Sequence, residues 1–324
     1  MNKLLLGIDG GGTKTHAVVV DLSGNLVATA AHSGANWERT GIHATENTLR
    51  EIIGQALDGI GASSETIVAA TFALAGIDWE SDLELFAPVA HSLQLSDRSN
   101  FINDSIAALF AGSSSGIGCV SIAGTGGKTS GRNQSQTLQT MGMDLGEGGG
   151  AGQLVSLALD YIARVYHGIE KPSALTQLIL EQSGFANETA LFKAVARDEY
   201  RLDEDLAPQI FSLATLGDHG AIAITNVVAA QHATDVIAMI SRLGLSDADV
   251  PVIRAGGLHT AGCVTFDATF ERVLGESQPK ASPKVLEISP VYGAVIHAAH
   301  GYFGNIPSDF LNNLFDQARA KGDL

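Results

Sequence analysis

The sequence predicts an α/β protein built from two related domains. A chain of 324 residues is longer than one hydrophobic core usually grows, so two domains of roughly 100 to 200 residues are expected. Apolar strand patterns alternate with amphipathic helices, which is typical of parallel β-α-β arrangements. A strand, a glycine turn and a second strand also occur twice, about 115 residues apart. We therefore expect a first domain over residues 1–115 and a second over residues 116–324, with a cleft between them.

Composition narrows the possible ligands. The chain has 19 basic and 35 acidic residues and a net charge of −16. This balance opposes binding to nucleic acids or anionic membranes, because both need a basic surface. An anionic ligand would have to be held by local hydrogen-bond donors and a metal ion.

The cysteines and the apolar stretches point to an intracellular protein without a metal cluster. Cys119 and Cys263 are far apart and lie outside any C-x-x-C spacing, so they predict structural thiols instead of a zinc or iron–sulfur site. The N-terminal apolar run is short, and no stretch approaches 18 uninterrupted apolar residues. We expect a cytoplasmic protein that does not enter a membrane.

The first hairpin carries the clearest ligand-binding pattern. An apolar strand over residues 4–8 is followed by Asp9 and by three consecutive glycines, Gly10–Gly12. Glycines let successive backbone N–H groups converge on an anion, Thr13 and Thr15 add hydroxyl donors, and Asp9 can hold a hydrated magnesium ion. An ordinary tight hairpin is the alternative, but it needs only one or two glycines. The pattern favours binding of a nucleotide phosphate.

A polar loop follows the third strand, which is expected over residues 26–30. It contains Asn36 and Trp37, an amide and a ring that could bind the hydroxyls and the apolar face of a sugar. A tryptophan that packs onto its own domain explains the pattern equally well. The next apolar periodicity predicts a helix over residues 44–60.

Two further strands end at candidate ligand-binding positions. The strand over residues 67–74 runs into a turn containing Gly76, and a helix is expected over residues 82–93. Asp104 then lies at the end of a strand and the start of a helix, where open α/β sheets bind ligands. Its alternative role is that of a helix N-cap. We favour a catalytic carboxylate.

The second strand–turn–strand unit comprises a strand at 119–123 and the glycine turn Gly124–Gly127, which includes Thr125. Two such turns could contact one phosphate chain from opposite sides. The competing P-loop motif fails, because G-x-x-x-x-G-K-[ST] requires glycine where the chain has Ile122.

The rest of the chain adds a helical region and a third glycine turn. A glycine-dense loop with two acids spans residues 141–152, and helices dominate from there to Leu243. A strand then runs into Gly256–Gly257, where the missing side chains leave room for a flat base or a ribose. The last strand is expected over residues 284–288 and the last core helix from Pro290 to His300.

His297 and His300 share a face of that last helix, but no other potential ligand clusters with them in the sequence. Packed or solvated histidines explain them better than a metal site does.

Five motifs in order resemble those of the actin/sugar-kinase/heat-shock ATPase superfamily. They match its first phosphate, first connecting, second phosphate, adenosine and second connecting motifs at Asp9–Thr15, Asn103-Asp104, Ala123–Gly126, Arg254–Gly257 and Pro290–Ala294. Their order and spacing are most similar to the BadF/BadG/BcrA/BcrD ATPase family, in its N-acetylglucosamine kinase-like branch. The resemblance extends over nearly the whole chain, to about Gly301.

The resemblance implies two ribonuclease H-like domains with mixed β-sheets flanked by helices, which close over Mg-ATP and a sugar. It implies a kinase that phosphorylates the C6 hydroxyl of N-acetylglucosamine or glucosamine, with Asp104 as general base and Asp9 near the magnesium ion. A homodimer is also implied.

The resemblance also implies which residues contact each ligand. Those expected at the nucleotide are Asp9, Gly10, Gly11, Gly12, Thr13, Lys14, Thr15, Gly124, Thr125, Gly126, Gly127, Gly256 and Gly257. Those expected at the sugar are Asn36, Trp37, Gly76, Asp104 and Glu147.

The chain departs from the branch in two places. Asn36 and Trp37 are adjacent where the branch has an Asn-x-Trp type loop. Gly146-Glu147-Gly148-Gly149-Gly150 stands where the branch usually has Gly-Asp-Glu-Gly-Ser. Because that loop normally contacts the sugar, the sugar specificity follows less directly than the nucleotide site.

Two other functions share this scaffold. An activator ATPase of 2-hydroxyacyl-CoA dehydratases or benzoyl-CoA reductases would need cluster cysteines in a glycine-rich motif, which Cys119 and Cys263 do not provide. A non-catalytic sugar- or nucleotide-sensing protein is favoured by the altered 146–150 loop. A sugar kinase remains the preferred interpretation.

Overall fold

The computed structural model describes residues 3–322, which form two compact units. Unit 1 contains the described residues up to Val120, the short segment Gly131–Thr137 and the segment from Leu286 onward. Unit 2 contains Ser121–Ser130 and Leu138–Val285. The expected boundary at residues 115–116 therefore differs from this division, because the C-terminal segment packs with the N-terminal half of the chain.

Unit 1 is built on a mixed five-stranded sheet in the order β3-β2-β1-β4-β5. Strands β1, β2 and β3 pair antiparallel, whereas β4 pairs parallel to β1 and β5 parallel to β4. This is the expected hairpin followed by a parallel β-α-β arrangement. The strands are Leu4–Gly10, Lys14–Asp21, Leu26–Ser33, Ile67–Leu74 and Ser99–Asn103.

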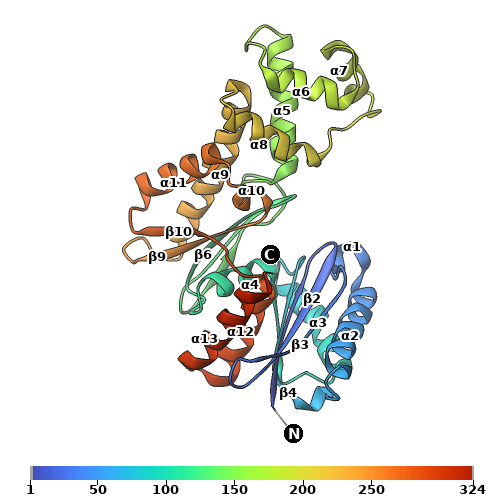
Figure 1. The fold of residues 1–324 in the computed structure, drawn as a ribbon, viewed down its shortest axis with the longest axis vertical. Helices are drawn as coiled ribbons and strands as arrows, with labels where there is room; N and C mark the ends of the chain where they lie inside the picture. Colours follow the sequence, from blue (N-terminus) through green and yellow to red (C-terminus); the bar gives the residue numbers. More distant parts are fainter. Residues whose placement is uncertain (1–2, 323–324) are drawn as a thin grey trace. The chain divides into compact units, whose positions relative to one another are not determined.

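Helices cover both faces of this sheet (Figure 1). Leu4, Leu6 and Ile8 of β1 lie in one core cluster with buried residues of α2 and α3. The opposite face of β1 is covered by α12 and α4. The helical segments of unit 1 are α1 Trp37–Thr40, α2 Ile42–Asp58, η1 Ser64–Thr66, α3 Glu80–Ser92, α4 Asp104–Gly112, α12 Pro290–Phe303 and α13 Ser308–Lys321.

Close packing at two glycines explains why α12 belongs to unit 1. A Cβ atom on Gly7 would lie 2.6 Å from the backbone nitrogen of Val295, so β1 and α12 approach without a side chain between them. A Cβ on Gly293 would lie 1.8 Å from the carbonyl oxygen of Ala107 in α4. The second connecting motif thus packs directly against α4, the helix that begins at the first connecting motif.

Unit 2 contains a second five-stranded sheet, in the order β10-β9-β6-β7-β8. Its strands are β6 Gly118–Ala123, β7 Gly127–Arg132, β8 Thr137–Gln139, β9 Val250–Ala255 and β10 Ala281–Val285. The last strand begins and ends three residues before the predicted one. The two mixed sheets flanked by helices confirm the predicted fold class.

The central helix of unit 2 is α9, which contacts α5, α6, α8 and α11. The helical segments of unit 2 are α5 Ala151–Tyr166, α6 Ala174–Ser183, α7 Glu188–Ala196, η2 Glu204–Leu206, α8 Ala207–Thr215, α9 His219–Arg242, α10 Gly257–Thr260 and α11 Val264–Ser277. Among residues 3–322, α9 alone is long and apolar enough to cross a membrane. Eleven of its residues are buried within the unit, as expected of a core helix.

Candidate functional site

The first glycine turn is open on the side where a ligand would approach. The backbone N–H of Gly11 donates to the carbonyl of Lys14 at 2.9 Å and closes the turn. A Cβ on Gly11 would meet only that carbonyl oxygen, at 3.7 Å. The folded backbone therefore tolerates a side chain at Gly11, and the space above it is free for a ligand.

Asp9 and Asp104 of unit 1 are near enough for their charges to interact. Asp9 is partly buried near the end of β1, on the face covered by α12, and Asp104 is the first residue of α4. Burial and the charge of Asp104 raise the pKa of Asp9 to about 7. Two carboxylates whose charges interact are a donor set that suits Mg²⁺, which prefers oxygen ligands.

Asp104 is not the N-cap of its helix. The cap is Asn103, whose side-chain oxygen accepts from the backbone N–H of Ser105 at 3.0 Å. The amide nitrogen of Asn103 donates to the carbonyl of Ile77 and to the carboxylate of Asp78, which ties β5 to the turn after β4. Asp104 is therefore not needed for capping.

Arg39 is a basic residue at this turn that the sequence interpretation missed. Its guanidinium nitrogen lies 3.0 Å from the position that a Cβ on Gly12 would occupy. Thr13 and Lys14 are exposed beside it. The only signal in the sequence was a positive charge shortly after the Asn36-Trp37 loop, which could not be placed without the fold.

Thr15 lies apart from this group. It is fully buried, and its hydroxyl donates to the carbonyl of Ser33 at 2.7 Å, which joins β2 to β3. The expected phosphate contact would require this hydroxyl to leave its partner. Its observed contact is structural.

The Asn36-Trp37 loop is held by contacts within unit 1. The Asn36 side chain accepts from the N–H of Glu38 and caps α1, while the Trp37 indole N–H donates to the carbonyl of Gly76 at 2.6 Å. The Trp37 ring is half-buried and meets Phe86 edge to face. The structure thus brings Asn36, Trp37 and Gly76 together through contacts within unit 1, and their contact with a sugar stays a prediction.

The second glycine turn rests on the glycine-dense loop. Cβ atoms on Gly124 and Gly126 would meet nothing within 4 Å, whereas a Cβ on Gly127 would lie 1.7 Å from the carbonyl oxygen of Gly148. A Cβ on Gly150 would lie 2.2 Å from the carbonyl oxygen of Gly124. The turn is therefore open on one side, with Thr125 exposed, and backed by residues 148–150 on the other.

The third turn contacts the second. Gly256 has a φ of +89°, and a Cβ there would lie 2.6 Å from the carbonyl of Ala123, whereas Gly257 is exposed with open space around it. Strands β6 and β9 are neighbours in the sheet, so both turns lie in unit 2 as one surface.

Glu147 stabilises its own loop. Its buried carboxylate accepts from the N–H groups of Gly142 and Met143 at 3.0 and 2.7 Å. Burial alone would raise its pKa, but these bonds, a bond from Thr140 and the charge of Lys128 lower the pKa below its usual value.

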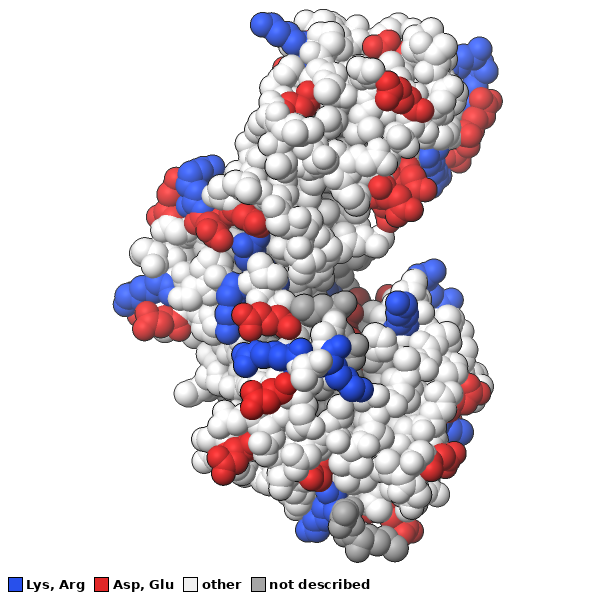
Figure 2. Space-filling view, viewed as in Figure 1, with Lys and Arg blue, Asp and Glu red and all other residues white. Residues whose placement is uncertain are grey.

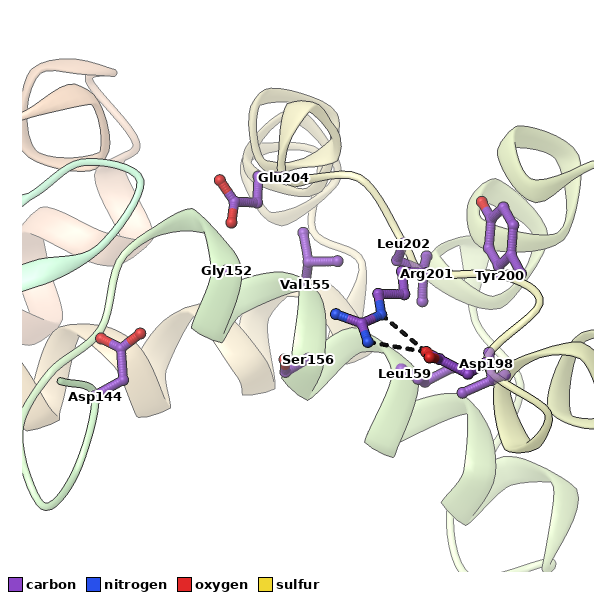
Figure 3. Close-up of a pocket in the computed structure, with 11 residues that line it drawn as sticks. Asp144, Gly152, Val155, Ser156, Leu159, Asp198, Tyr200, Arg201, Leu202 and Glu204 are labelled. Carbon is purple, nitrogen blue, oxygen red and sulfur yellow. Dashed lines mark hydrogen bonds and ion pairs between the residues drawn. The ribbon is translucent and has the colours of Figure 1, made fainter. Parts of the chain in front are cut away.

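A pocket of about 430 Å³ borders the second turn in unit 2 (Figure 3). Val155 and Leu159 of α5 form an apolar part of its wall, and Arg201 pairs with Asp198 at one end. At Gly152, a Cβ would lie 3.3 Å from the carboxylate of Glu204 and 3.8 Å from the carbonyl of Thr125. Gly152 therefore lies between the carboxylate of Glu204 in the pocket wall and the second turn.

Within residues 3–322, no cluster of three or more His, Cys, Asp or Glu side chains could hold a metal ion alone. Cys119 and Cys263 are both buried, and burial raises the pKa of the Cys119 thiol to about 12. On the face shown in Figure 2, basic side chains lie in small groups with acidic ones. Exclusion of nucleic-acid and membrane partners stays a prediction.

Comparison with known proteins identifies relatives over most of the chain. An N-acetyl-D-glucosamine kinase from Dictyostelium discoideum is 26% identical over 91% of this chain and 98% of its own length. An N-acetylmuramic acid/N-acetylglucosamine kinase from Clostridium acetobutylicum is 24% identical, with the same coverage. These names support the expectation of an ATP-dependent sugar kinase.

Solved structures share the fold. A Chromobacterium violaceum protein assigned as an N-acetylglucosamine kinase matches with a TM-score of 0.65 at 18% identity, over 92% of this chain and 99% of its own. A ROK family glucokinase from Streptomyces griseus matches with a TM-score of 0.53 at 17% identity, over 91% and 98%. The family model for BadF/BadG/BcrA/BcrD ATPases matches residues 6–298, which confirms the resemblance inferred from the five motifs. The chain therefore belongs to the BadF/BadG/BcrA/BcrD ATPase family.

Proposed function

We propose that the chain transfers the γ-phosphoryl group of ATP to the C6 hydroxyl of an amino sugar, N-acetylglucosamine or glucosamine. The observation that carries this proposal is the carboxylate of Asp104, whose charge acts on Asp9 and which is not needed as a cap, because Asn103 caps the helix. The names of the relatives support a sugar as the acceptor.

The glycine turns support the nucleotide site. Gly11, Gly124 and Gly126 have open space where a Cβ would lie, and none has a positive φ. Neither packing nor backbone strain in the fold therefore requires glycine there, whereas close approach of a phosphate chain would. The Gly256–Gly257 turn would take the adenosine.

Phosphoryl transfer needs positioning and charge neutralisation more than covalent chemistry. The N–H groups of Gly10–Gly12, with Thr13, Lys14 and Arg39, would bind the phosphates in unit 1. Asp9 would hold Mg²⁺, which neutralises phosphate charge when bound. Because the Thr15 hydroxyl is bonded to Ser33, we leave it out of this set.

Asp104 would act as general base. Its carboxylate would take the proton of the C6 hydroxyl as that oxygen bonds to the γ-phosphorus, the bond to the β–γ bridging oxygen breaks and ADP leaves. Such a base generally contributes about 10²- to 10⁴-fold.

In unit 1, the sugar would contact the Trp37 ring and the residues beside it, Asn36 and Gly76. The Gly146–Gly150 loop would act on specificity mainly through the turn that it supports, because Gly148 and Gly150 have no room for the larger side chains usual in this branch. A homodimer in the cytoplasm remains part of the proposal.

The test is ATP turnover with Mg²⁺ and a panel of N-acetylglucosamine, glucosamine, N-acetylmannosamine and glucose. We expect ADP release to depend on one of the two named amino sugars. No stimulation by any sugar would overturn the proposal.

A second candidate is a protein that binds sugar and nucleotide without transfer. It is favoured by the Glu147 carboxylate and the Asn36 amide oxygen, which are both bonded within their own units. Calorimetric binding of Mg-ADP and of the sugar without turnover would support it.

A further inference from the structure

A chain of buried polar side chains runs through unit 2 beneath the two proposed nucleotide turns. It begins at Arg254 on β9, passes through His259 on α10, Ser121 on β6 and His232 on α9, and ends at the backbone carbonyl of Gly149. All four side chains are at least 97% buried. Groups so deeply buried are costly unless they are hydrogen-bonded.

The two ends of this chain, together with the lowered pKa of His232, fix the direction of every bond. The Arg254 Nε can only donate, so Nδ1 of His259 accepts, at 3.1 Å. His259 Nε2–H then donates to the Ser121 hydroxyl at 3.0 Å, and Ser121 donates to Nδ1 of His232 at 3.1 Å. His232 Nε2–H donates to the Gly149 carbonyl at 2.8 Å. His259 is thus neutral with its proton on Nε2, and His232, whose pKa burial lowers to about 4, is neutral at neutral pH with its proton on Nε2.

Other contacts anchor Arg254 and keep the imidazoles neutral. The Arg254 guanidinium pairs with Asp267 and Glu271 of α11 and stacks over the Phe270 ring at 5.2 Å. Burial lowers the pKa of His232 to about 4 and also lowers the pKa of His259. At neutral pH, only one arrangement of protons pairs every donor and acceptor along this series of hydrogen bonds.

The bonded groups lie next to the nucleotide turns. Arg254 is two residues before Gly256, and Ser121 is three residues before Gly124. Gly149 belongs to the loop that backs the 124–127 turn, and Gly148 of that loop also donates to Asp235 of α9 at 2.6 Å. This series of hydrogen bonds therefore links the ends of β6 and β9 to residues 148–150, which back the turn after β6.

We propose that Ser121, His232 and His259 are positioning residues for nucleotide binding, which set the Gly124–Gly127 turn and the Gly256–Gly257 turn at the spacing that the nucleotide requires. This inference rests on the proposed function, which assigns both turns to the nucleotide. The residues contact each other and the loop backbone; the turns would contact the ligand.

The first experiment is calorimetric binding of Mg-ADP to the full chain and to Ser121→Ala. Removing this hydroxyl leaves the His259 donor and the His232 acceptor without their partner. We expect affinity to fall about tenfold, which corresponds to about 1.4 kcal/mol. The matched control is Thr225→Val on α9, because the buried Thr225 hydroxyl has no hydrogen-bond partner among the described residues. The control is expected to bind within about twofold of the parent.

A pair of variants at His232 tests the bond direction and serves if Ser121→Ala does not fold. His232→Gln places an N–H near Nε2 and keeps the bond to Gly149, whereas His232→Asn places an oxygen near Nδ1 and keeps the bond from Ser121. In the proposal, the bond from His232 to the Gly149 carbonyl fixes the position of the loop. His232→Gln, which keeps this bond, should therefore bind Mg-ADP more tightly than His232→Asn.

A kinetic split separates positioning from general destabilisation. The KM for ATP should rise in Ser121→Ala, while kcat at saturating ATP and the KM for the sugar stay near those of the parent. Unchanged Mg-ADP affinity in Ser121→Ala, or equal affinity in the two His232 variants, would overturn the inference alone. A parent chain that does not bind Mg-ADP would overturn the nucleotide site itself, and the inference with it.

Discussion

At the scale of single residues, the assignment of a catalytic role to Asp104 depends on which residue caps α4. The sequence left Asp104 with two possible functions, and the fold assigns capping to Asn103, which also bonds to the turn after β4. The sequence could not show this, because Asn and Asp cap helices about equally well. The burial of Thr15 could not be predicted from the sequence either, because a threonine just before an apolar run can equally well be exposed.

Asp104→Asn should abolish transfer and leave the fold intact. The amide cannot take the hydroxyl proton, so kcat should fall by roughly two or more orders of magnitude. Because Asn103 still caps α4, the melting temperature and the sugar affinity should stay near those of the parent. A variant that retains its kcat would show that Asp104 is not the base.

Arg39→Ala should weaken Mg-ATP binding, because the guanidinium lies beside the first glycine turn. We expect a loss of about 1.5 to 3 kcal/mol, which is typical of a hydrogen bond to a charged group. Arg50→Ala is the matched control, since Arg50 is a partly exposed arginine on α2 that pairs with Glu46. Equal small effects in both variants, measured by calorimetry, would mean that Arg39 acts only through net charge.

At the scale of elements, alternating burial and glycine placement made the fold predictable. The three N-terminal strands, the strand over residues 67–74 and the helix after Asp104 form as expected. The last strand lies at Ala281–Val285 instead of 284–288, because it pairs in parallel with all but the last residue of β9. That register depends on a partner distant in sequence, which local patterns do not contain.

Gly11→Val tests the first turn as a ligand-binding element. A Cβ at Gly11 meets only the Lys14 carbonyl, at 3.7 Å, so the variant should fold with a melting temperature close to that of the parent. The side chain would occupy the space of the phosphates and should reduce Mg-ATP affinity by more than tenfold. Gly54→Ala in α2, also with open space, is the control that should bind normally. Unchanged affinity in Gly11→Val would remove the hairpin from the nucleotide site.

At the scale of the whole molecule, the sequence predicted two units but not the division of the chain between them. The C-terminal helices return to unit 1 because Gly7 and Gly293 let α12 approach β1 and α4 closely. In the sequence, only the second connecting motif indicated that α12 returns to unit 1. Local periodicity does not reveal a contact between segments so far apart in the chain. The buried polar chain of unit 2 was also missed, since its members are scattered from residue 121 to residue 259.

Buried neutral histidines should make the stability of the molecule depend on pH. Burial, with the charges of Arg132 and His300, lowers the pKa of His297 to about 4, while the unfolded chain has the ordinary value near 6.5. Between these values the unfolded state binds the extra proton, so the His297 contribution to the free energy of unfolding falls as pH falls. Relative to His297→Gln, the parent should lose about 1.4 kcal/mol per pH unit in this window. Urea unfolding of both chains checks this, and a constant difference from pH 7 to pH 4.5 would contradict it.

The most direct test of the central claim is the product formed from Mg-ATP and N-acetylglucosamine or glucosamine, identified by ³¹P and ¹³C NMR. The account predicts ADP and the sugar 6-phosphate in equal amounts with the parent chain, and neither above background with Asp104→Asn. A phosphate on another hydroxyl would contradict the C6 assignment, and ATP hydrolysis without any sugar phosphate would contradict the kinase itself.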